Sequence, residues 1–373
     1  MILVFGATGY TGRMVVESLV SDGRDVRIAG RSRERLEKLS DKHGGLDWRV
    51  ADVKEPKSVV EAAEGASVLV TTVGPYTWWG HVAADAALIS GIPYIDITGE
   101  PNWLRKVFDE YGPLAAEAGI PMLPAIGYDY VPGNLAGALA LEAAGNAAHS
   151  VDIGYFLTGE NSRSMKSLSG GTLRSLRASS SEEQFAFQGG KLVSERGAKR
   201  VIAFEIAGRR ATAVSIGSTE HYTLPRLAPQ LENVNAGLGW FGPASRVVTL
   251  ASALGRQAER IPGVSSVVQR ITGGQGMRDT NGASGPSGPN ENSRAQARTN
   301  VVAVARDAGG RDVARVHLDG PNPYDLTGEI VGWVAGQAED GSIDATGAIG
   351  PVEAFGLEAL RDACAAIGLK EIQ

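Results

Sequence analysis

The chain has 373 residues, of which 43% are hydrophobic and 21% charged, with a net charge of -6 and one cysteine. Its length is enough for about two to three domains of roughly 100–200 residues, and its composition excludes a chain that is disordered throughout. The acidic balance excludes a typical nucleic-acid-binding protein, which needs clustered basic residues. A lone cysteine, Cys364, can form neither an internal disulfide nor a zinc cage, and its apolar setting predicts a buried thiol.

Strands and helices alternate from the first residues to about residue 125. Short β-branched runs predict strands, and the segments between them carry apolar residues at helical spacing. This alternation predicts βαβ crossovers and a parallel sheet with helices on both faces. The predicted strands are 2–5, 26–29, 67–72, 94–97 and 120–125, and the predicted helices lie near 12–21, 33–43, 56–64, 81–90 and 111–119.

The pattern changes after about residue 127. Strands near 151–157, 185–192, 201–206, 211–216, 301–306 and 313–318 tend to follow one another, which is typical of an antiparallel sheet. Helices near 169–178, 244–260 and 322–338 would cover one face, and a last helix spans 351–367. Residues 273–296 are rich in Gly, Ser, Asn and Pro and predict a mobile surface loop. We therefore expect an α/β first domain, 1–127, and an α+β second domain, 128–345.

The opening Met-Ile-Leu-Val-Phe meets glycine at once, which predicts a strand rather than a signal peptide. No apolar run reaches the ~18 residues of a membrane-spanning helix. We therefore expect a cytoplasmic protein, with peripheral membrane contact and a homodimer left open.

Glycines punctuate the turn after the first strand, in the run Gly6-Ala7-Thr8-Gly9-Tyr10-Thr11-Gly12. Glycine lets the backbone turn sharply and approach a pyrophosphate, and the N–H groups of the following helix attract the anion. Because the run stands between a predicted strand and a predicted helix, it predicts a dinucleotide site. The alternative is that the glycines serve only tight packing of strand against helix.

The end of the second strand indicates which cofactor binds. NAD enzymes usually place a carboxylate there for the ribose 2′-hydroxyl, whereas this chain has Arg31 and Ser32. Arginine can bind a 2′-phosphate bidentately and serine adds a hydroxyl donor, so we expect NADP(H). The run Arg49-Val50-Ala51-Asp52-Val53 predicts a further strand, the third of the chain, before the strand at 67–72. Asp52 at its end could bond the adenine amino group, or it could be a helix cap or a turn residue.

The fourth strand runs into Val73, Gly74, Pro75 and Tyr76 at the edge where ligands bind. A turn at this place would lie against the nicotinamide ribose. The aromatic residues Trp78 and Trp79 follow it and predict an apolar pocket wall.

Together with other short runs, these motifs resemble the saccharopine dehydrogenase-like oxidoreductases, especially the branch of the trans-acting enoyl reductases. The other runs are Asp96-Ile97-Thr98-Gly99-Glu100, Gly127-Tyr128-Asp129-Tyr130-Val131-Pro132, Ser169-Gly170-Gly171-Thr172 and Gly350-Pro351 before the last helix. The resemblance implies an NADP-binding Rossmann domain, interrupted by a mixed-sheet domain for substrate and dimerisation. It also implies that residues 346–373 return to the first domain.

Hydride transfer belongs to the cofactor, so the protein has to position the acceptor and supply a proton. Tyr76 and Tyr128 are candidate hydroxyl donors, as is Tyr130, and His81 is a candidate proton donor; each could instead be a packing residue. Asp96 and Glu100 could order the pocket or cap a helix. No spacing of His, Cys or carboxylates predicts a metal site.

The function that we expect is an NADP(H)-dependent oxidoreductase that reduces a C=C bond of a carrier-bound acyl or lipid-like substrate. One alternative is a saccharopine-type reductase acting on the imine of an amino acid. The basic residues that could clamp its carboxylates are Arg163, Lys166, Arg174 and Arg177. The other alternative is an NADPH-binding scaffold or redox sensor without catalysis.

Overall fold

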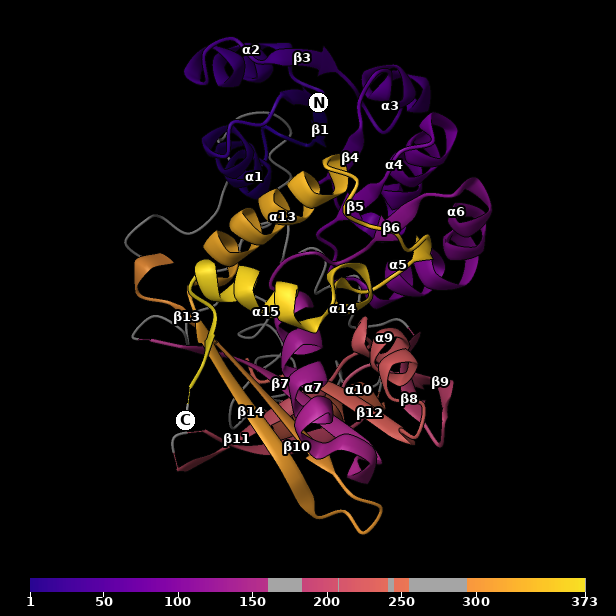
Figure 1. Cartoon of the computed structure of the whole chain (residues 1–373), viewed down its shortest axis with the longest axis vertical. Coiled ribbons are helices and arrows are strands. Elements are labelled where there is room, and N and C mark those ends of the chain that lie inside the picture. The colour runs from indigo at the N-terminus through magenta and orange to yellow at the C-terminus, as the bar shows by residue number, and fades with distance from the viewer. Residues whose placement is uncertain (160–182, 207, 241–244, 255–293, 373) are drawn as a thin grey trace. The chain divides into compact units, whose positions relative to one another are not determined.

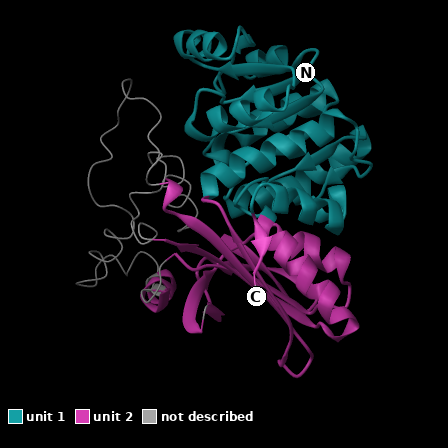
Figure 2. Ribbon diagram, turned by 60° about the vertical axis from the view of Figure 1, so that its left-hand side comes forward, with its two compact units in different colours: residues 1–131, 323–368 teal, residues 132–322, 369–373 magenta. Residues whose placement is uncertain are grey.

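The computed structural model describes residues 1–159, 183–206, 208–240, 245–254 and 294–372 (Figure 1). The chain forms two compact units, each with its own sheet (Figure 2). Unit 1 comprises Met1–Val131 and Pro323–Gly368, and unit 2 comprises Pro132–Asn322 and Leu369–Gln373. In sequence, residues 132–322 of unit 2 are therefore inserted between the two parts of unit 1, and its residues 369–373 follow the second part.

Unit 1 contains a parallel sheet with the strand order β15-β6-β5-β4-β1-β2-β3. The buried strand β1 (Ile2–Phe5) lies between β2 (Val26–Gly30) and β4 (Val68–Thr71) and is parallel to both. Strand order reverses at β1, so the carboxyl ends of β1 and β4 form the topological switch point where such sheets bind ligands. The other strands are β3 (Asp47–Val50), β5 (Tyr94–Asp96), β6 (Pro121–Leu123) and β15 (Gly347–Ala348).

Helices cover both faces of this sheet, as right-handed crossovers to either side of β1 require. On one face α1 (Tyr10–Ser21) packs beside α13 (Pro323–Glu339), whose Gly328 and Gly332 leave room for Met14 and Ser18. On the other face α3 (Pro56–Ala63) packs beside α4 (Tyr76–Ser90). The remaining helices are α2 (Arg33–Lys42), α5 (Pro101–Lys106), the π-helical η1 (Val107–Tyr111), α6 (Gly112–Ala118), α14 (Pro351–Phe355) and α15 (Leu357–Ala366).

Two features of the C-terminal region differ from expectation. Helix α13 belongs to unit 1 rather than to a second domain that ends at residue 345, because its small residues pack against α1. The predicted helix 351–367 is two helices, since Gly356 (φ 76°, ψ 159°) interrupts it between α14 and α15. Cys364 is fully buried, as predicted, and burial raises the pKa of its thiol to about 12.

Unit 2 contains a mixed sheet with the order β10-β11-β12-β7-β13-β14-β16, to which β8 and β9 are attached at β12. Its central strand β7 (Ser150–Thr158) is antiparallel to β13 (Arg298–Arg306) and parallel to β12 (Asn233–Leu238). The antiparallel pairing predicted for consecutive strands is confirmed for β10 (Val201–Ile206) with β11 (Arg209–Ser215) and for β13 with β14 (Asp312–Gly320). The other elements are η2 (Gly145–Ala147), β8 (Glu183–Gln188), β9 (Lys191–Arg196), α10 (Ser245–Leu254) and β16 (Lys370–Glu371).

Two helices of unit 2 pack against each other and the sheet. A Cβ on Gly137 of α7 (Val131–Ala144) would lie 2.6 Å from Leu224 of α9 (Glu220–Leu227) and 3.4 Å from Ile153 of β7. The sequence predicted neither helix, nor β12.

The single strand expected near 185–192 is instead the hairpin of β8 and β9. Gly189 (φ 59°) and Gly190 (φ 75°) adopt the left-handed conformations that a tight hairpin turn needs. The predicted helix 169–178, the end of the predicted helix 244–260 and nearly all of the predicted loop 273–296 lie outside the described residues.

Candidate nucleotide-binding site

The turn between β1 and α1 contains three glycines with different structural roles. Gly6 has a φ of 92°, which favours glycine, and its N–H donates to the carbonyl of Ala29 at 2.9 Å. A Cβ on Gly12 would lie 2.3 Å from the Gly6 carbonyl oxygen, so the fold excludes a side chain there. Gly9 is exposed, and a Cβ on it would meet only that same oxygen, at 3.1 Å. Packing therefore accounts for Gly6 and Gly12, whereas Gly9 is the exposed N-cap of α1.

The first turn of α1 is suited to an anion. Helix α1, which the structure describes completely, has Gly9 as its N-cap without a side-chain cap and no acidic residue in its first turn. The positive end of the helix dipole is therefore not neutralised by its own side chains. Thr8 lies over the end of β2, with its hydroxyl oxygen 3.7 Å from where a Cβ on Gly30 would be. The Tyr10 ring packs edge-on against Tyr324 of α13, so its predicted cofactor contact would use the backbone.

Arg31 and Ser32 directly follow β2. Arg31 is exposed and makes no ion pair with any residue that the structure describes, and Ser32 is the N-cap of α2. The charges beside them are engaged: Glu34 pairs with Lys38 at 2.7 Å, and the Arg33 guanidinium stacks over the ring of Trp48 at 4.9 Å. Among the described residues, the guanidinium of Arg31 at the carboxyl end of β2 therefore has no ion-pair partner.

Asp52 lies two residues beyond β3. Its Oδ1 accepts the N–H of Lys54 at 3.0 Å, and its own N–H donates to the hydroxyl of Ser58 at 3.0 Å. It is therefore a turn residue, one of the roles that the sequence allowed, whereas the N-cap of α3 is Glu55. Its contact with an adenine stays a prediction.

The turn after β4 lies against the glycine turn. A Cβ on Gly6 would be 2.6 Å from Thr72 Oγ1 and 2.8 Å from Val73 Cγ2, and the Thr72 hydroxyl donates to the Gly6 carbonyl at 3.1 Å. The two segments that we expected to bind the pyrophosphate and the nicotinamide are therefore adjacent. No role was predicted for Thr72, although its position just after a buried strand at the ligand edge is a usable signal.

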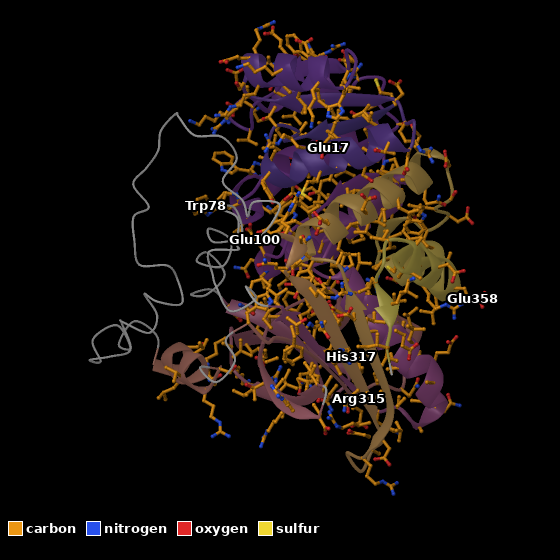
Figure 3. The ribbon with its side chains drawn as sticks, turned by 90° about the vertical axis from the view of Figure 1, so that its left-hand side faces the viewer. Glu17, Trp78, Glu100, Arg315, His317 and Glu358 are labelled. Carbon is orange, nitrogen blue, oxygen red and sulfur yellow. The ribbon has the colours of Figure 1, made fainter. Side chains whose placement is uncertain are left out.

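Helix α4 begins at Tyr76 rather than near residue 81, with Pro75 as its N-cap. Trp78, Trp79 and His81 are thus on the first two turns of a helix and not in a loop. The Trp78 side chain is 61% exposed, at the outer margin of unit 1 in Figure 3. Trp79 and His81 are half-buried.

The candidate tyrosines are buried. The Tyr76 hydroxyl donates to the carbonyl of Thr71 at 2.9 Å, and burial, reinforced by the Asp96 charge, raises the pKa of this hydroxyl well above its usual value. Tyr128 is 4% exposed, and its N–H donates to the hydroxyl of Thr327 on α13 at 3.0 Å. The Tyr130 hydroxyl donates to the Gly99 carbonyl at 3.4 Å. In this arrangement the Tyr76 hydroxyl is committed to the main chain.

Glu100 caps α4 from 24 residues further along the chain. Its fully buried carboxylate accepts the N–H of Tyr76 at 2.9 Å, the N–H of Thr77 at 2.8 Å and the hydroxyl of Thr77 at 2.8 Å. The capping role that the sequence allowed for Glu100 is confirmed. The capped helix is α4, however, and not α5, which Glu100 directly precedes.

Asp96, also fully buried, organises the chain after β5. Its carboxylate accepts the Tyr94 hydroxyl, the Trp103 indole N–H and the backbone N–H groups of Thr98 and Ala125, at 2.8–2.9 Å. Burial raises the pKa of Asp96, and these donors oppose the rise. Asp96 therefore fixes the main chain on both sides of the β5 carboxyl end.

The N-terminal part of the chain matches a family model described as NAD(P)H-binding over residues 6–88. The trans-acting enoyl reductase of Mycobacterium ulcerans is 39% identical over 140 residues, which cover 36% of this chain and 34% of that protein. The lipid droplet localized protein of Caenorhabditis elegans is 37% identical over 146 residues, again 36% of this chain and 34% of that protein. These matches span about a third of the relatives' length.

The likeness in fold extends over the whole chain. Saccharopine dehydrogenase (L-Glu forming) from Saccharomyces cerevisiae has a TM-score of 0.62 at 15% identity, with 100% of this chain and 99% of that chain covered. At this identity the likeness is one of fold. The nicotinamide nucleotide domain is in unit 1, where the glycine turn, Arg31 and the turn after β4 all fall inside residues 6–88.

The described part of the chain contains neither a metal-binding cluster nor a membrane-spanning helix. No group of three His, Cys, Asp or Glu side chains in it could hold a metal ion. None of its helices is long and apolar enough to cross a membrane.

Proposed function

We propose that the protein is an NADP(H)-dependent oxidoreductase that reduces a C=C bond of an acyl or lipid-like substrate. The observation that carries the proposal is the exposed Gly9, at a helix N-terminus without acidic residues, beside the turn after β4 at the switch point of the sheet. The bound nucleotide would supply a hydride. The relatives named trans-acting enoyl reductases support a C=C bond as the acceptor.

The proposed contacts assign one part of the cofactor to each segment. The turn from Gly6 to Gly12 holds the pyrophosphate, with Thr8, Gly9, Tyr10 and Thr11 between them. Arg31 and Ser32 hold the ribose 2′-phosphate, and Asp52 contacts the adenine. Val73, Gly74, Pro75 and Tyr76 support the nicotinamide half.

Charge favours NADP(H) over NAD(H) in this proposal. A 2′-phosphate placed at the end of β2 meets the unpaired guanidinium of Arg31, while Glu34 is engaged by Lys38. The Asp47 carboxylate of β3 is neutralised in turn by Arg27, whose Nε lies 2.7 Å from Asp47 Oδ2. An NAD(H) ribose hydroxyl would find no carboxylate in the place where NAD enzymes usually have one.

The proton that accompanies the hydride needs a donor from the protein or from water. We propose Tyr128 and His81 ahead of Tyr76, because the Tyr76 hydroxyl already donates to the Thr71 carbonyl inside the unit. Tyr128 and His81 come from the segment after β6 and from α4, and both elements lie at the carboxyl edge of the sheet.

A second candidate function is reduction of an imine, as in a saccharopine-type reaction. Support comes from the fold of the yeast enzyme, which matches this chain over its whole length. The residues that would clamp amino-acid carboxylates, Arg163, Lys166, Arg174 and Arg177, lie outside the described residues.

Titration with NADPH and NADH tests the cofactor. We expect NADPH to bind more tightly, and Arg31→Ala to weaken NADPH by about 10–150-fold while leaving NADH unchanged, the range for hydrogen bonds to a charged group. Arg35→Ala, an exposed arginine on α2, is the matched control and should leave both affinities unchanged. Equal affinities of the wild type for the two nucleotides would refute the NADP assignment.

Oxidation of NADPH tests the reaction. A trans-2-enoyl thioester should accelerate it, whereas an imine formed from glutamate and an aldehyde should not. The reverse pattern would favour the saccharopine-type reaction. Tight NADPH binding with neither substrate consumed would favour a scaffold or redox sensor.

The proposed setting is the cytoplasm, with an acyl substrate that is free or carried by a partner, and with a homodimer as the proposed assembly. Peripheral contact with a lipid surface is compatible with the relative that is named for lipid droplets. Fractionation of cells and sedimentation of the purified protein test these two points.

A further inference from the structure

Two helices begin at the carboxyl ends of adjacent parallel strands, α1 after β1 and α4 after β4. Each directs its positive N-terminal end to the same edge of the sheet. Helix α1 is capped by Gly9 and has no acidic residue in its first turn, within the completely described segment 9–21. Helix α4 is closed by the carboxylate of Glu100. The N-terminus of α1 therefore keeps its positive end open, whereas a carboxylate neutralises the N-terminus of α4.

Glu100 is fixed at both of its ends. Its N–H donates to the Thr98 hydroxyl at 3.0 Å, and the Thr98 N–H in turn donates to Asp96 at 2.9 Å. Its carboxylate reaches α4 and lies 3.8 Å from where a Cβ on Gly74 would be. The chain after β5 thereby determines where the turn Gly74-Pro75 stands.

We infer that Glu100 is a positioning residue for the nicotinamide half of the cofactor, an inference that rests on the proposed function. Glu100 acts through Tyr76 and Thr77, whose N–H groups it holds, and so fixes the turn that supports the nicotinamide ribose. Its charge also neutralises the N-terminus of α4, so that a pyrophosphate finds only the N-terminus of α1 open to it. Glu100 itself, at 0% exposure, touches no ligand.

A purely structural cap would behave differently from a positioning residue. Loss of a structural cap loosens the whole unit and weakens every ligand together. Loss of a positioning residue weakens only ligands that carry a nicotinamide. NADPH and 2′,5′-ADP, which has the adenine and the 2′-phosphate but no nicotinamide, separate these two cases.

The experiment measures both dissociation constants for Glu100→Gln. The amide oxygen of the glutamine can still accept one of the two N–H groups, those of Tyr76 and Thr77, but its NH₂ group would face the other, which is also a donor. We expect NADPH to bind about tenfold more weakly, which corresponds to loss of one hydrogen bond to a charged group, and 2′,5′-ADP to bind as in the wild type. Asp85→Asn is the matched control, because Asp85 lies on the same helix and accepts the Tyr111 hydroxyl at 2.8 Å, away from the helix start. It should change neither constant.

Thr77→Val supplies a second variant if Glu100→Gln does not fold. It removes only the hydroxyl bond to Glu100 and should weaken NADPH by about threefold without affecting 2′,5′-ADP, as expected for a bond at the weak end of the range. Equal weakening of both ligands, or no weakening of NADPH, would overturn the positioning role. A wild type that binds neither ligand would instead overturn the proposed function.

Discussion

Asp96 in unit 1 and Glu220 in unit 2 are both completely buried carboxylates, and neither has an ion-pair partner among the described residues. Asp96 is surrounded mainly by N–H groups, those of Thr98, Ala125 and Trp103. Glu220 is surrounded mainly by hydroxyls: it accepts from Tyr155, from Thr219 at 3.4 Å, and also from its own backbone N–H. The two sites therefore bury the same chemical group among different donors.

The kind of donor decides what the carboxylate can do. An N–H group only donates, so Asp96 has to remain an acceptor and holds the main chain in one place. A hydroxyl can donate or accept, so Glu220 can take up a proton without leaving a polar atom unpaired. Burial raises the pKa of both carboxylates, that of Glu220 to about 7, and the donors around each oppose the rise. We therefore expect Asp96 to act as a structural anchor and Glu220 to titrate.

The sharpest way to break the comparison is Asp96→Ala. It leaves four buried donors without an acceptor, each costing about 1–3 kcal/mol, so the free energy of unfolding should fall by about 4 kcal/mol or more. Urea unfolding followed by circular dichroism measures the loss. Asp344→Ala, at an exposed position of the same unit, should change stability by less than about 0.5 kcal/mol. A small loss in the free energy of unfolding of Asp96→Ala would show that these donors find other partners.

The pH dependence of stability tests Glu220. Since the native state keeps a proton on Glu220, whose pKa is about 7 rather than 4.5, the free energy of unfolding should fall as pH rises from about 4.5 to 7. The neighbouring His221 acts oppositely. Burial, assisted by the Arg200 charge, lowers its pKa from 6.5 to about 4, so that stability rises with pH over that interval. The two effects should nearly cancel in the wild type below about pH 6.5.

Glu220→Gln removes one of these opposing effects. As pH rises from 4 to 6.5, the free energy of unfolding of the variant should rise by about 3 kcal/mol, and it should not fall between pH 6.5 and 8. Unfolding in urea at several pH values measures this, and His221→Gln should show the opposite slope. A Glu220→Gln curve that runs parallel to the wild type would contradict the titrating role.

Tyr76→Phe has the smallest expected effect. It removes a neutral hydroxyl that donates to the Thr71 carbonyl, so stability should fall by about 1 kcal/mol. NADPH affinity should be unchanged, and NADPH oxidation with an enoyl thioester should stay within a few-fold of the wild type. A loss of about 10²-fold in turnover would instead identify Tyr76 as the proton donor.

The parallel strands of unit 1 could be predicted because each is a short apolar run buried on both faces, such as Ile2–Phe5. Helix α7 could not be predicted, because its Ala- and Gly-rich sequence is apolar all round and shows no periodicity. The hairpin of β8 and β9 was missed because the apolar pattern continues on both sides of Gly189 and Gly190.

The candidate site divides in the same way. The roles of the glycine residues and of Arg31 could be predicted from the sequence, because they act locally, within a turn or at a strand end. The cap that Glu100 provides for Tyr76 joins positions 24 apart, and the bond between Tyr155 and Glu220 joins positions 65 apart. No local pattern encodes which carboxylate reaches which helix, because that depends on how the strands are ordered in the sheet.

The interrupted course of unit 1 has a consequence for its biosynthesis. A ribosome makes β1 to β6 first, and α13 emerges only after residues 132–322, an interval of about 10–40 s at about 5–20 residues per second. Until then the side of α1 that receives Gly328 and Gly332 is not covered by α13. An mRNA truncated within the coding region of unit 2 would yield a protein with a complete glycine turn but without α13, the helix that covers α1.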